Sequence, residues 1–379
     1  MRLIRTAPAA LFSMLALLTL SPARAQPGGE AKQPDMSLTA DMRAEVIEGA
    51  LKKLESAYVF PDVAKKMAEG IRSRLEKKEY DNITSAKQLA TTLTDQLQAI
   101  SHDKHLRVRY SHEPIPKRLR GEPGPEEKAR FRRDVAANNF GFEKVERLEG
   151  NVGYLELRGF LPADMAGETA ASAMAFLAHT DTLIIDLRKN GGGSPGMVAL
   201  MCSYLLPAEE VVHLNDLYFR PENSTHQWWT LPYVPGKRYE GKKVYLLTSK
   251  RTFSAAEEFT YNLKNLHRAT IVGETTGGGA HPGGPRPIND HFSVWVPTGR
   301  AINPVSKTNW EGTGVKPDIE VSADLALQTA YLDALKKLAE KKKDEPMAGK
   351  QFKELIERAQ KELDERKAGN KQTALANPR

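Results

Sequence analysis

A serine stands where a strand pattern gives way to a helix pattern. Ser254 follows the apolar run that ends at Leu247 and precedes the helical pattern of residues 255–266. At a helix N-terminus, free main-chain N–H groups and the helix dipole favour negative charge. A serine nucleophile suits this position, because the N–H of Ala255 would donate to an oxyanion. The Ser-x-x-Glu pattern that ends at Glu257 also fits a capping box in which Ser254 only caps the helix.

A glycine-rich turn follows another apolar strand pattern. Asp186-Leu187-Arg188 leads through Asn190 into Gly191-Gly192-Gly193. Glycines let the main chain approach a ligand and point N–H groups into a pocket. The spacing matches neither a phosphate-binding loop nor a dinucleotide fold, so a nucleotide site has weak support. A tight turn without a ligand is the alternative interpretation.

A serine nucleophile needs a proton acceptor, and the pKa of histidine lies near neutrality. The chain has nine histidines, and the residues alone do not choose among His102, His105 and His281. Glu311 lies beside Trp310 and would orient an imidazole, or it is an ordinary acidic loop residue. The sequence has no His-Glu-x-x-His pattern or cysteine cluster, so it implies no metal or organic cofactor.

Four motifs in this order resemble those of the tail-specific (C-terminal-processing) serine peptidase family. The resemblance covers about residues 42–340 and is greatest to the branch that includes interphotoreceptor retinoid-binding protein and related bacterial peptidases. The motifs are Asp186-Leu187-Arg188 with Asn190-Gly191-Gly192-Gly193, Thr248-Ser249 with Ser254-Ala255-Ala256-Glu257, Val272-Gly273-Glu274-Thr275-Thr276-Gly277-Gly278-Gly279, and Glu311-Gly312 with Gly314-Val315 and Pro317-Asp318.

The resemblance implies a fold and a set of roles. The fold would be an α/β spiral of strand-strand-helix units, related to crotonase and the Clp protease, after a small N-terminal helical bundle. Ser254 would be the nucleophile. The N–H of Ala255 and an N–H of Gly191 or Gly192 would form the oxyanion hole.

The base departs from the best-known members, which use a lysine in a Gly-Lys-Gly type segment. The matching segment here, residues 277–280, has no lysine. Lys264 lies ten residues after the serine on the same helix, about 15 Å away by helical rise. Tricorn-like members use a histidine in an Asp-x-His pattern and a glutamate, which the resemblance assigns to His105 as base and Glu311 as its orienter. His281 is the rival base.

The N-terminus is typical of a secretory signal peptide. Residues 1–25 combine early arginines, a short apolar stretch and a small-x-small end, which predicts cleavage after Ala25 and a periplasmic or secreted protein. Removal of this segment leaves 52 Lys+Arg against 48 Asp+Glu, a net charge of +4. With no basic stripe among aromatics, we expect no nucleic-acid partner. No later segment predicts a membrane span, and Cys202 alone excludes an intrachain disulfide.

Periodicity divides the remaining chain into successive regions. The interval from 111 to 143 is too short for the PDZ domain of the processing peptidases. We predict a flexible leader (26–39), a helical bundle (40–101), a strand with a linker or lid (102–140), a catalytic α/β domain (141–342), and a C-terminal helix and tail (343–379) that frays from residue 369. The predicted strands are 152–157, 182–187, 243–247 and 269–272, and the predicted helices are 166–177, 195–206, 255–266 and 324–342.

These observations favour an exported serine peptidase that acts on a peptide or protein substrate through an acyl-enzyme on Ser254. An ordinary histidine base predicts a rate that falls in acid, with a limb near pH 6–7. The alternative is a non-catalytic binder of hydrophobic, retinoid-like or fatty-acid-like molecules. A third hypothesis is an interaction module built on the helical bundle and the C-terminal helix. The sequence leaves the substrate and the oligomeric state open. The aromatic candidates for an apolar cleft are Trp228, Trp229, Tyr218 and Phe219.

Overall fold

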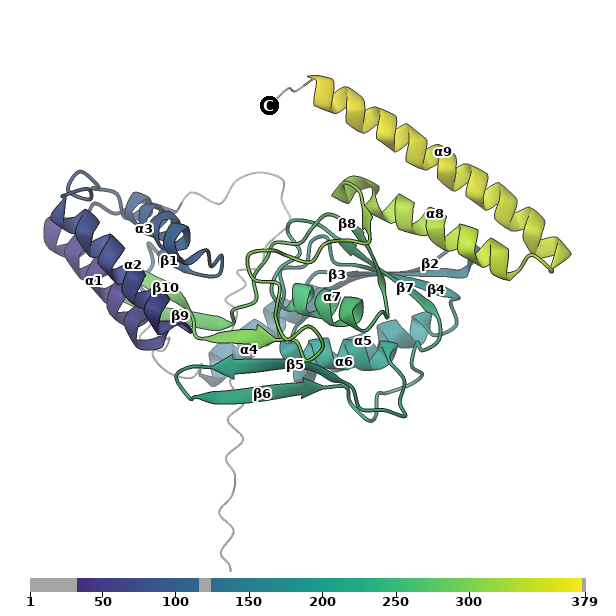
Figure 1. Cartoon of the computed structure of the whole chain (residues 1–379), viewed down its shortest axis with the longest axis horizontal. Helices are drawn as coiled ribbons and strands as arrows, with labels where there is room; N and C mark the ends of the chain where they lie inside the picture. Colours follow the sequence, from purple (N-terminus) through teal and green to yellow (C-terminus); the bar gives the residue numbers. More distant parts are fainter. Residues whose placement is uncertain (1–32, 116–123, 377–379) are drawn as a thin grey trace, which may run out of the picture.

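The structure, a computed structural model, describes residues 33–115 and 124–376 (Figure 1). The predicted signal peptide and its cleavage site lie outside the described residues. So do residues 26–32 of the predicted leader and residues 116–123 of the predicted lid. Within the described part of the chain, no helix is both long and apolar enough to cross a membrane.

Three N-terminal helices share a core with a small sheet. Side chains such as Ile47, Met67 and Leu89 are fully buried and pack together with Val294 of that sheet. The sheet has the order β1-β10-β9, so it pairs the strand after the helices with strands far along the chain. The elements are α1 (Ala40–Ala57), α2 (Pro61–Glu76), α3 (Ala86–Ser101), β1 (Arg107–Tyr110), β9 (Gly283–Pro287) and β10 (Phe292–Pro297).

A six-stranded sheet of order β12-β8-β7-β4-β3-β2 forms the centre of the molecule. The neighbours from β3 to β12 are parallel, and β2 is antiparallel to β3. Such parallel strands are covered on both faces and are accordingly almost wholly apolar. The strands are β2 (Phe142–Leu148), β3 (Val152–Leu157), β4 (Thr182–Asp186), β7 (Lys243–Thr248), β8 (Thr270–Gly273) and β12 (Ile319–Glu320).

Helices cover both faces of the central sheet. Alternate side chains of a strand point to opposite faces, so Leu183 and Ile185 pack with α5–α7, whereas Ile184 packs with α8 and α9. Figure 1 shows α8 and α9 together on the side away from α5 and α6. The helices are α5 (Ala163–Leu177), α6 (Pro195–Leu205), α7 (Ala255–Asn265), α8 (Ala323–Lys341) and α9 (Pro346–Ala376).

The remaining described elements differ from the sequence prediction. A third sheet of order β11-β5-β6 was not predicted, nor were β9 and β10. Within the region predicted as a linker, Pro125–Ala136 form α4, because a proline at the first helical turn costs no hydrogen bond. Helix α9 continues past residue 369. These elements are β5 (His213–Phe219), β6 (Ser224–Trp229), β11 (Gly299–Ile302) and the 3₁₀ turns Asn139–Gly141 and Glu149–Asn151.

The predicted fold class is confirmed: a mixed α/β domain follows N-terminal helices. Strand β3 has the predicted bounds, and β4, β7 and β8 each begin within one residue of the predicted start. Helix α7 begins at the predicted Ala255, directly after the candidate serine. The carboxyl ends of β4 and β7 therefore lie side by side and carry the glycine turn and the serine to one edge of the sheet.

Helix α7 carries a buried carboxyl group whose environment is apolar. Glu258 is 4% exposed, and its Oε1 has no hydrogen-bond partner within the described residues. Burial raises the pKa of Glu258 to about 7, which outweighs the opposing effect of Asn215. Between pH 4.5 and 7, the folded state therefore keeps a proton that the unfolded state has released.

We expect this carboxyl group to make stability fall as the pH rises through that window. Relative to the wild type, Glu258→Gln should gain about 2–3 kcal/mol of unfolding free energy between pH 5 and pH 8. Urea unfolding of both proteins at the two pH values measures the gain. The exposed Glu240→Gln serves as the control. If wild type and Glu258→Gln changed in parallel with pH, the buried-carboxyl explanation would be wrong.

Candidate active site

Ser254 has a main-chain conformation that few residues with a side chain adopt. Its φ is 55° and its ψ is −123°, and it stands immediately before α7. Such a conformation costs about 1–3 kcal/mol and persists only where the surroundings enforce it. Ser254 and Glu257 form the capping box that the sequence allows, with Ser254 N–H donating to Glu257 Oε2 at 3.0 Å. Ser254 therefore belongs to the cap and also stands at the helix N-terminus.

The loop before Ser254 is fastened to the glycine turn. Thr252 Oγ1 donates to the carbonyl of Leu187 at 2.8 Å, and Phe253 N–H donates to the carbonyl of Asn190 at 3.1 Å. The amide of Asn190 donates to Leu157 O at 2.9 Å, which ties the turn to β3. The two loops at the ends of β4 and β7 are thus one hydrogen-bonded unit.

Gly192 lies directly against the candidate nucleophile. Its φ is +107°, and a Cβ atom there would lie 2.8 Å from Ser254 Cβ and 2.9 Å from Ala255 N. Only glycine fits this approach. The N–H of Gly192 donates to Asn190 Oδ1 at 2.9 Å. In the described part of the chain, the N–H groups of Gly191 and Ala255 make no hydrogen bond, so both are free to donate to another acceptor.

His105 lies beside the residue that precedes the serine. Its ring centroid is 4.6 Å from that of Phe253, and its side chain is 10% exposed. Its main-chain N–H donates to Asp103 Oδ1 at 3.0 Å. Its Nδ1 lies 4.0 Å from the same oxygen and has no hydrogen-bond partner among the described residues. Burial lowers the pKa of His105 to about 4, so the imidazole is neutral at neutral pH.

Glu311 lies beside the rival histidine. Its Oε2 is 3.5 Å from His281 Nδ1 and accepts a hydrogen bond from Ala280 N–H at 2.5 Å. No hydrogen bond joins Glu311 to His105 in the described residues. Burial, reinforced by the neighbouring charge of Asp103, raises the pKa of Glu311 to about 7. The structure therefore brings the predicted carboxylate close to His281 rather than to His105. Asp103 contacts both histidines.

Asp103 connects the two histidines and was not among the predicted site residues. It is fully buried, and its Oδ2 accepts from His281 Nδ1 at 2.8 Å and from Tyr58 O–H at 3.1 Å. The Asp-x-His pattern was its only sequence signal, and Tyr58 had none. Asp103, His281 and Glu311 place three possible metal-ligand atoms within 4.8 Å of one another. Within this cluster the hydrogen bond joins His281 to Asp103, whereas Glu311 Oε1 has no hydrogen-bond partner in the described residues.

Glu257 is a second residue whose role the sequence did not reveal beyond a cap. Its carboxylate is fully buried and accepts four hydrogen bonds. Besides Ser254 N–H, the donors are Thr276 Oγ1 at 2.5 Å, Gly278 N–H at 2.6 Å and Gly279 N–H at 2.8 Å. Burial raises the pKa of Glu257 to about 7, against the effect of these donors. Glu257 thus fixes the serine relative to the 276–279 loop.

That loop also contacts the histidine. A methyl group added at Gly279 would meet the rings of Phe253 and His105. Within the described residues, Ser254 Oγ makes no hydrogen bond to either His105 or His281. Lys264, by contrast, pairs with Asp318 at 3.0 Å. Ser254 thus directly follows the phenylalanine that packs against the imidazole of His105, so the two residue types that acyl transfer needs lie on neighbouring loops.

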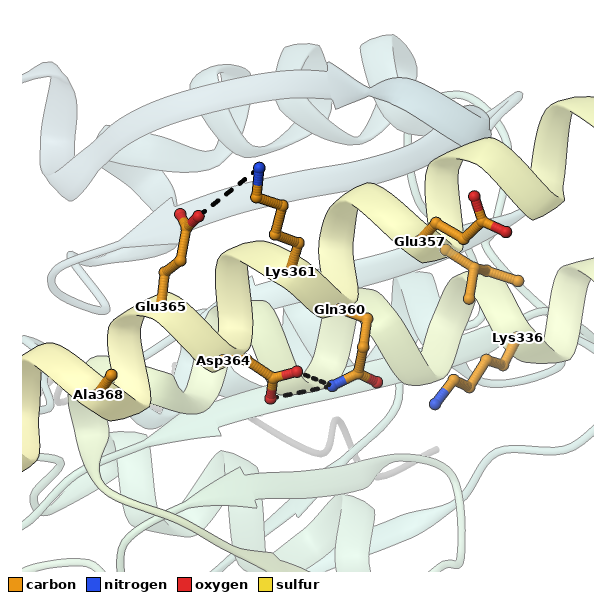
Figure 2. A pocket seen from close by; sticks show the side chains of 8 residues that line it. Lys336, Glu357, Gln360, Lys361, Asp364, Glu365 and Ala368 are labelled. Carbon is orange, nitrogen blue, oxygen red and sulfur yellow. Dashed lines mark hydrogen bonds and ion pairs between the residues drawn. The ribbon is translucent and has the colours of Figure 1, made fainter.

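Two hollows in the surface differ in their relation to these residues. A cleft of about 480 Å³ includes Phe253 and Gly277 in its lining. A larger hollow of about 710 Å³ lies along α8 and α9, and none of the candidate site residues lines it. Figure 2 shows Lys361 paired with Glu365, and the amide of Gln360 hydrogen-bonded to Asp364. This hollow is a solvated, salt-bridged helix face.

The aromatic residues considered for an apolar cleft are engaged in local packing. Trp229 stacks on His213 with ring centroids 4.1 Å apart, and Arg300 lies over Tyr218 at 5.4 Å. Trp228 packs against the main core. None of these residues lines the cleft next to Phe253. The packing interpretation therefore accounts for them.

Known proteins match both parts of the chain. The model of peptidase family S41 matches residues 151–321, and the model of the N-terminal domain of this peptidase in eukaryotic IRBP matches residues 36–133. A probable CtpA-like serine protease of Staphylococcus epidermidis is 24% identical over 316 residues, covering 73% of this chain and 60% of the relative. A second strain of that species has an equally similar protein. The chain thus spans about 60% of the length of the curated relatives it matches.

Solved structures share the fold. A putative peptidase from Parabacteroides merdae aligns with a TM-score of 0.51 at 20% identity, covering 74% of this chain and 90% of that one. A lipoprotein from Streptococcus agalactiae aligns with a TM-score of 0.50 at 16% identity, covering 80% and 97%.

We expect Glu257→Gln to loosen the serine without removing it. The amide NH₂ would face main-chain N–H donors, so at least one buried hydrogen bond is lost and a donor is left unpaired, at a cost of about 1–3 kcal/mol. Labelling of Ser254 by a fluorophosphonate should slow by at least about tenfold, a factor equal to about 1.4 kcal/mol. The exposed Glu240→Gln is the matched control. Unchanged labelling in Glu257→Gln would show that this network does not hold the serine.

Proposed function

Because the chain belongs to peptidase family S41, the tail-specific (C-terminal-processing) serine peptidases, we propose that it cleaves peptide bonds through an acyl-enzyme on Ser254. The observation that carries the proposal is the position of Ser254. It stands in a constrained conformation at the start of α7, against Gly192 and beside a loop that contacts a neutral imidazole. The substrate is a peptide or protein.

The reaction follows from these groups. The imidazole accepts the hydroxyl proton as Ser254 Oγ attacks the carbonyl carbon, and the N–H groups of Ala255 and Gly191 stabilise the oxyanion. The imidazolium then gives that proton to the leaving amine, and the C–N bond breaks. Water attacks the acyl-enzyme in the same way, which releases the acid and restores the serine.

We assign the base to His105 rather than His281. The support is its position, because the His105 ring packs against Phe253, the residue that directly precedes Ser254. Asp103 on Nδ1 of His281 is the kind of contact that orients a catalytic imidazole, so His281 stays the rival base. Asp103 is the carboxylate nearest to His105 Nδ1, at 4.0 Å. In this proposal Glu311 affects His105 indirectly, through His281 and Asp103, because it is the second carboxylate of the cluster of Asp103, His281 and Glu311.

We also propose that the enzyme works in the periplasm or outside the cell. The support is the signal-peptide pattern of residues 1–25, with cleavage after Ala25.

Replacing the nucleophile tests the reaction itself. Ser254→Ala should abolish fluorophosphonate labelling and lower the peptide-cleavage rate by at least about a thousandfold, while the thermal unfolding temperature stays within a few degrees. The control is Ser172→Ala on the exposed face of α5. Retention of cleavage or labelling by Ser254→Ala would rule out this serine as the nucleophile.

The pH dependence tests the base. Glu311 carries a pKa of about 7 and His105 one of about 4, so kcat/KM should fall in two steps as the pH is lowered through those values. Glu311→Gln should lack the upper step and keep the lower one. This two-step fall in kcat/KM replaces the single fall near pH 6–7 that the sequence predicts for an ordinary histidine base.

The same profile discriminates between the histidines. Circular dichroism at each pH separates loss of activity from unfolding. A single limb near the ordinary imidazole value of about 6.5 in Glu311→Gln would exclude buried His105 as the base. His281→Ala, which keeps His105, should retain the lower step.

A further inference from the structure

Four basic side chains surround the cleft beside Phe253. They come from the loop before β1, from β1 itself and from the loop between β7 and α7, and all four are exposed. Lys104 Nζ donates to the carbonyl of Gly277 at 2.6 Å across the cleft. The lining consists of Lys104, Arg107, Lys250, Arg251, Phe253, Thr276 and Gly277.

These cations have no carboxylate partner of their own. No ion pair in the described residues joins Lys104, Arg107, Lys250 or Arg251 to an acidic side chain. The carboxylate of Glu274 is nearby, and it accepts a hydrogen bond from the main-chain N–H of Lys250 at 3.2 Å. Elsewhere in the molecule, exposed cations commonly pair, as Arg72 does with two glutamates. Unpaired like charges around a concave surface attract an anion.

The cleft lies on the side of the candidate serine where the imidazole of His105 is. Phe253 directly precedes Ser254, and Lys104 directly precedes His105, whose ring lies against Phe253. In acyl transfer the base returns its proton to the leaving amine, so the leaving part of the substrate departs on the imidazole side. The cationic cleft is therefore placed for the segment that follows the scissile bond.

We propose that this cleft binds a carboxylate in the part of the substrate that follows the scissile bond. The carboxylate is either an acidic side chain or the C-terminus of the substrate chain. The inference rests on the proposed peptidase function and names the substrate class for that same site. Guanidinium groups of Arg107 and Arg251 suit a carboxylate, because their N–H donors match its two oxygens.

Three fluorescent peptides with the same residues before the scissile bond test the proposal. One has glutamates after that bond and an amidated C-terminus, the second has glutamines and a free C-terminus, and the third has glutamines and an amide. Binding is measured by fluorescence anisotropy with full-length Ser254→Ala, and kcat/KM with the active enzyme. The variant is Lys250→Gln/Arg251→Gln in each background, with Arg147→Gln on β2 as the matched control.

We expect one or both carboxylate peptides to bind about tenfold more tightly than the third peptide at low salt. The double variant should reduce that preference about fivefold or more and leave the third peptide unaffected, whereas Arg147→Gln changes neither. Raising NaCl from 0.05 to 0.5 M should weaken only the carboxylate peptides, since salt screens exposed charges. The peptide that is preferred identifies the source of the carboxylate.

Equal binding of all three peptides to Ser254→Ala would overturn the inference, as would a preference that the double variant keeps. A preference for carboxylate peptides that are bound but never cleaved would support the cleft and contradict the peptidase function. Cleavage without the preference would do the reverse. The two proposals therefore fail separately.

Discussion

The candidate active site depends on the hydrogen bonds that the buried carboxylate of Glu257 accepts. This carboxylate accepts hydrogen bonds from Ser254, Thr276, Gly278 and Gly279, and no other group in the described residues links the serine to the loop against His105 in this way. Hydrogen bonds to a charged group contribute about 1.5–3 kcal/mol each. While Glu257 is ionised, the bond from Ser254 N–H is of the same order as the cost of about 1–3 kcal/mol for the unfavourable φ of Ser254. Glu257 therefore helps to hold Ser254 in a main-chain conformation that a serine would not adopt by itself.

The second constraint is that the proposed base and the proposed nucleophile come from parts of the chain that have separate hydrophobic cores. Pairing of β1 with β10 places Arg107 opposite Trp295, which anchors the end of the loop that carries His105. The buried hydrogen bond between Asp103 and His281 also joins the loop before β1 to the loop before β9. Because each part has its own core, a small shift between them changes the distance from imidazole to serine while leaving both parts folded.

How much was predictable depends on the range of the interaction. Helix α7 and its serine follow from local periodicity and a local cap, and the close approach of Gly192 follows from residue type. The hydrogen bonds that Glu257 accepts from Thr276, Gly278 and Gly279 join residues far apart in the chain, as does the pairing of Asp103 with His281, so no local pattern records them. Strand β9 was missed because Gly283–Pro287 is rich in glycine and proline, which local propensity assigns to turns. Its strand conformation is imposed by pairing with β10.

Burial shifts the pKa values of the proposed base, His105, and of the nearby carboxylate, Glu311, in opposite directions. It lowers the pKa of His105 to about 4, which keeps the imidazole unprotonated and makes it a weak base, and it raises the pKa of Glu311 to about 7. A base works best with a pKa near the working pH, so the nearby charge of Asp103, which raises the pKa of His105, favours catalysis. Ionised Glu311 would add negative charge to the same cluster. Proton occupancy of the carboxylates and basicity of the imidazole are therefore linked, and activity is expected to follow the charge of the whole cluster rather than that of one residue.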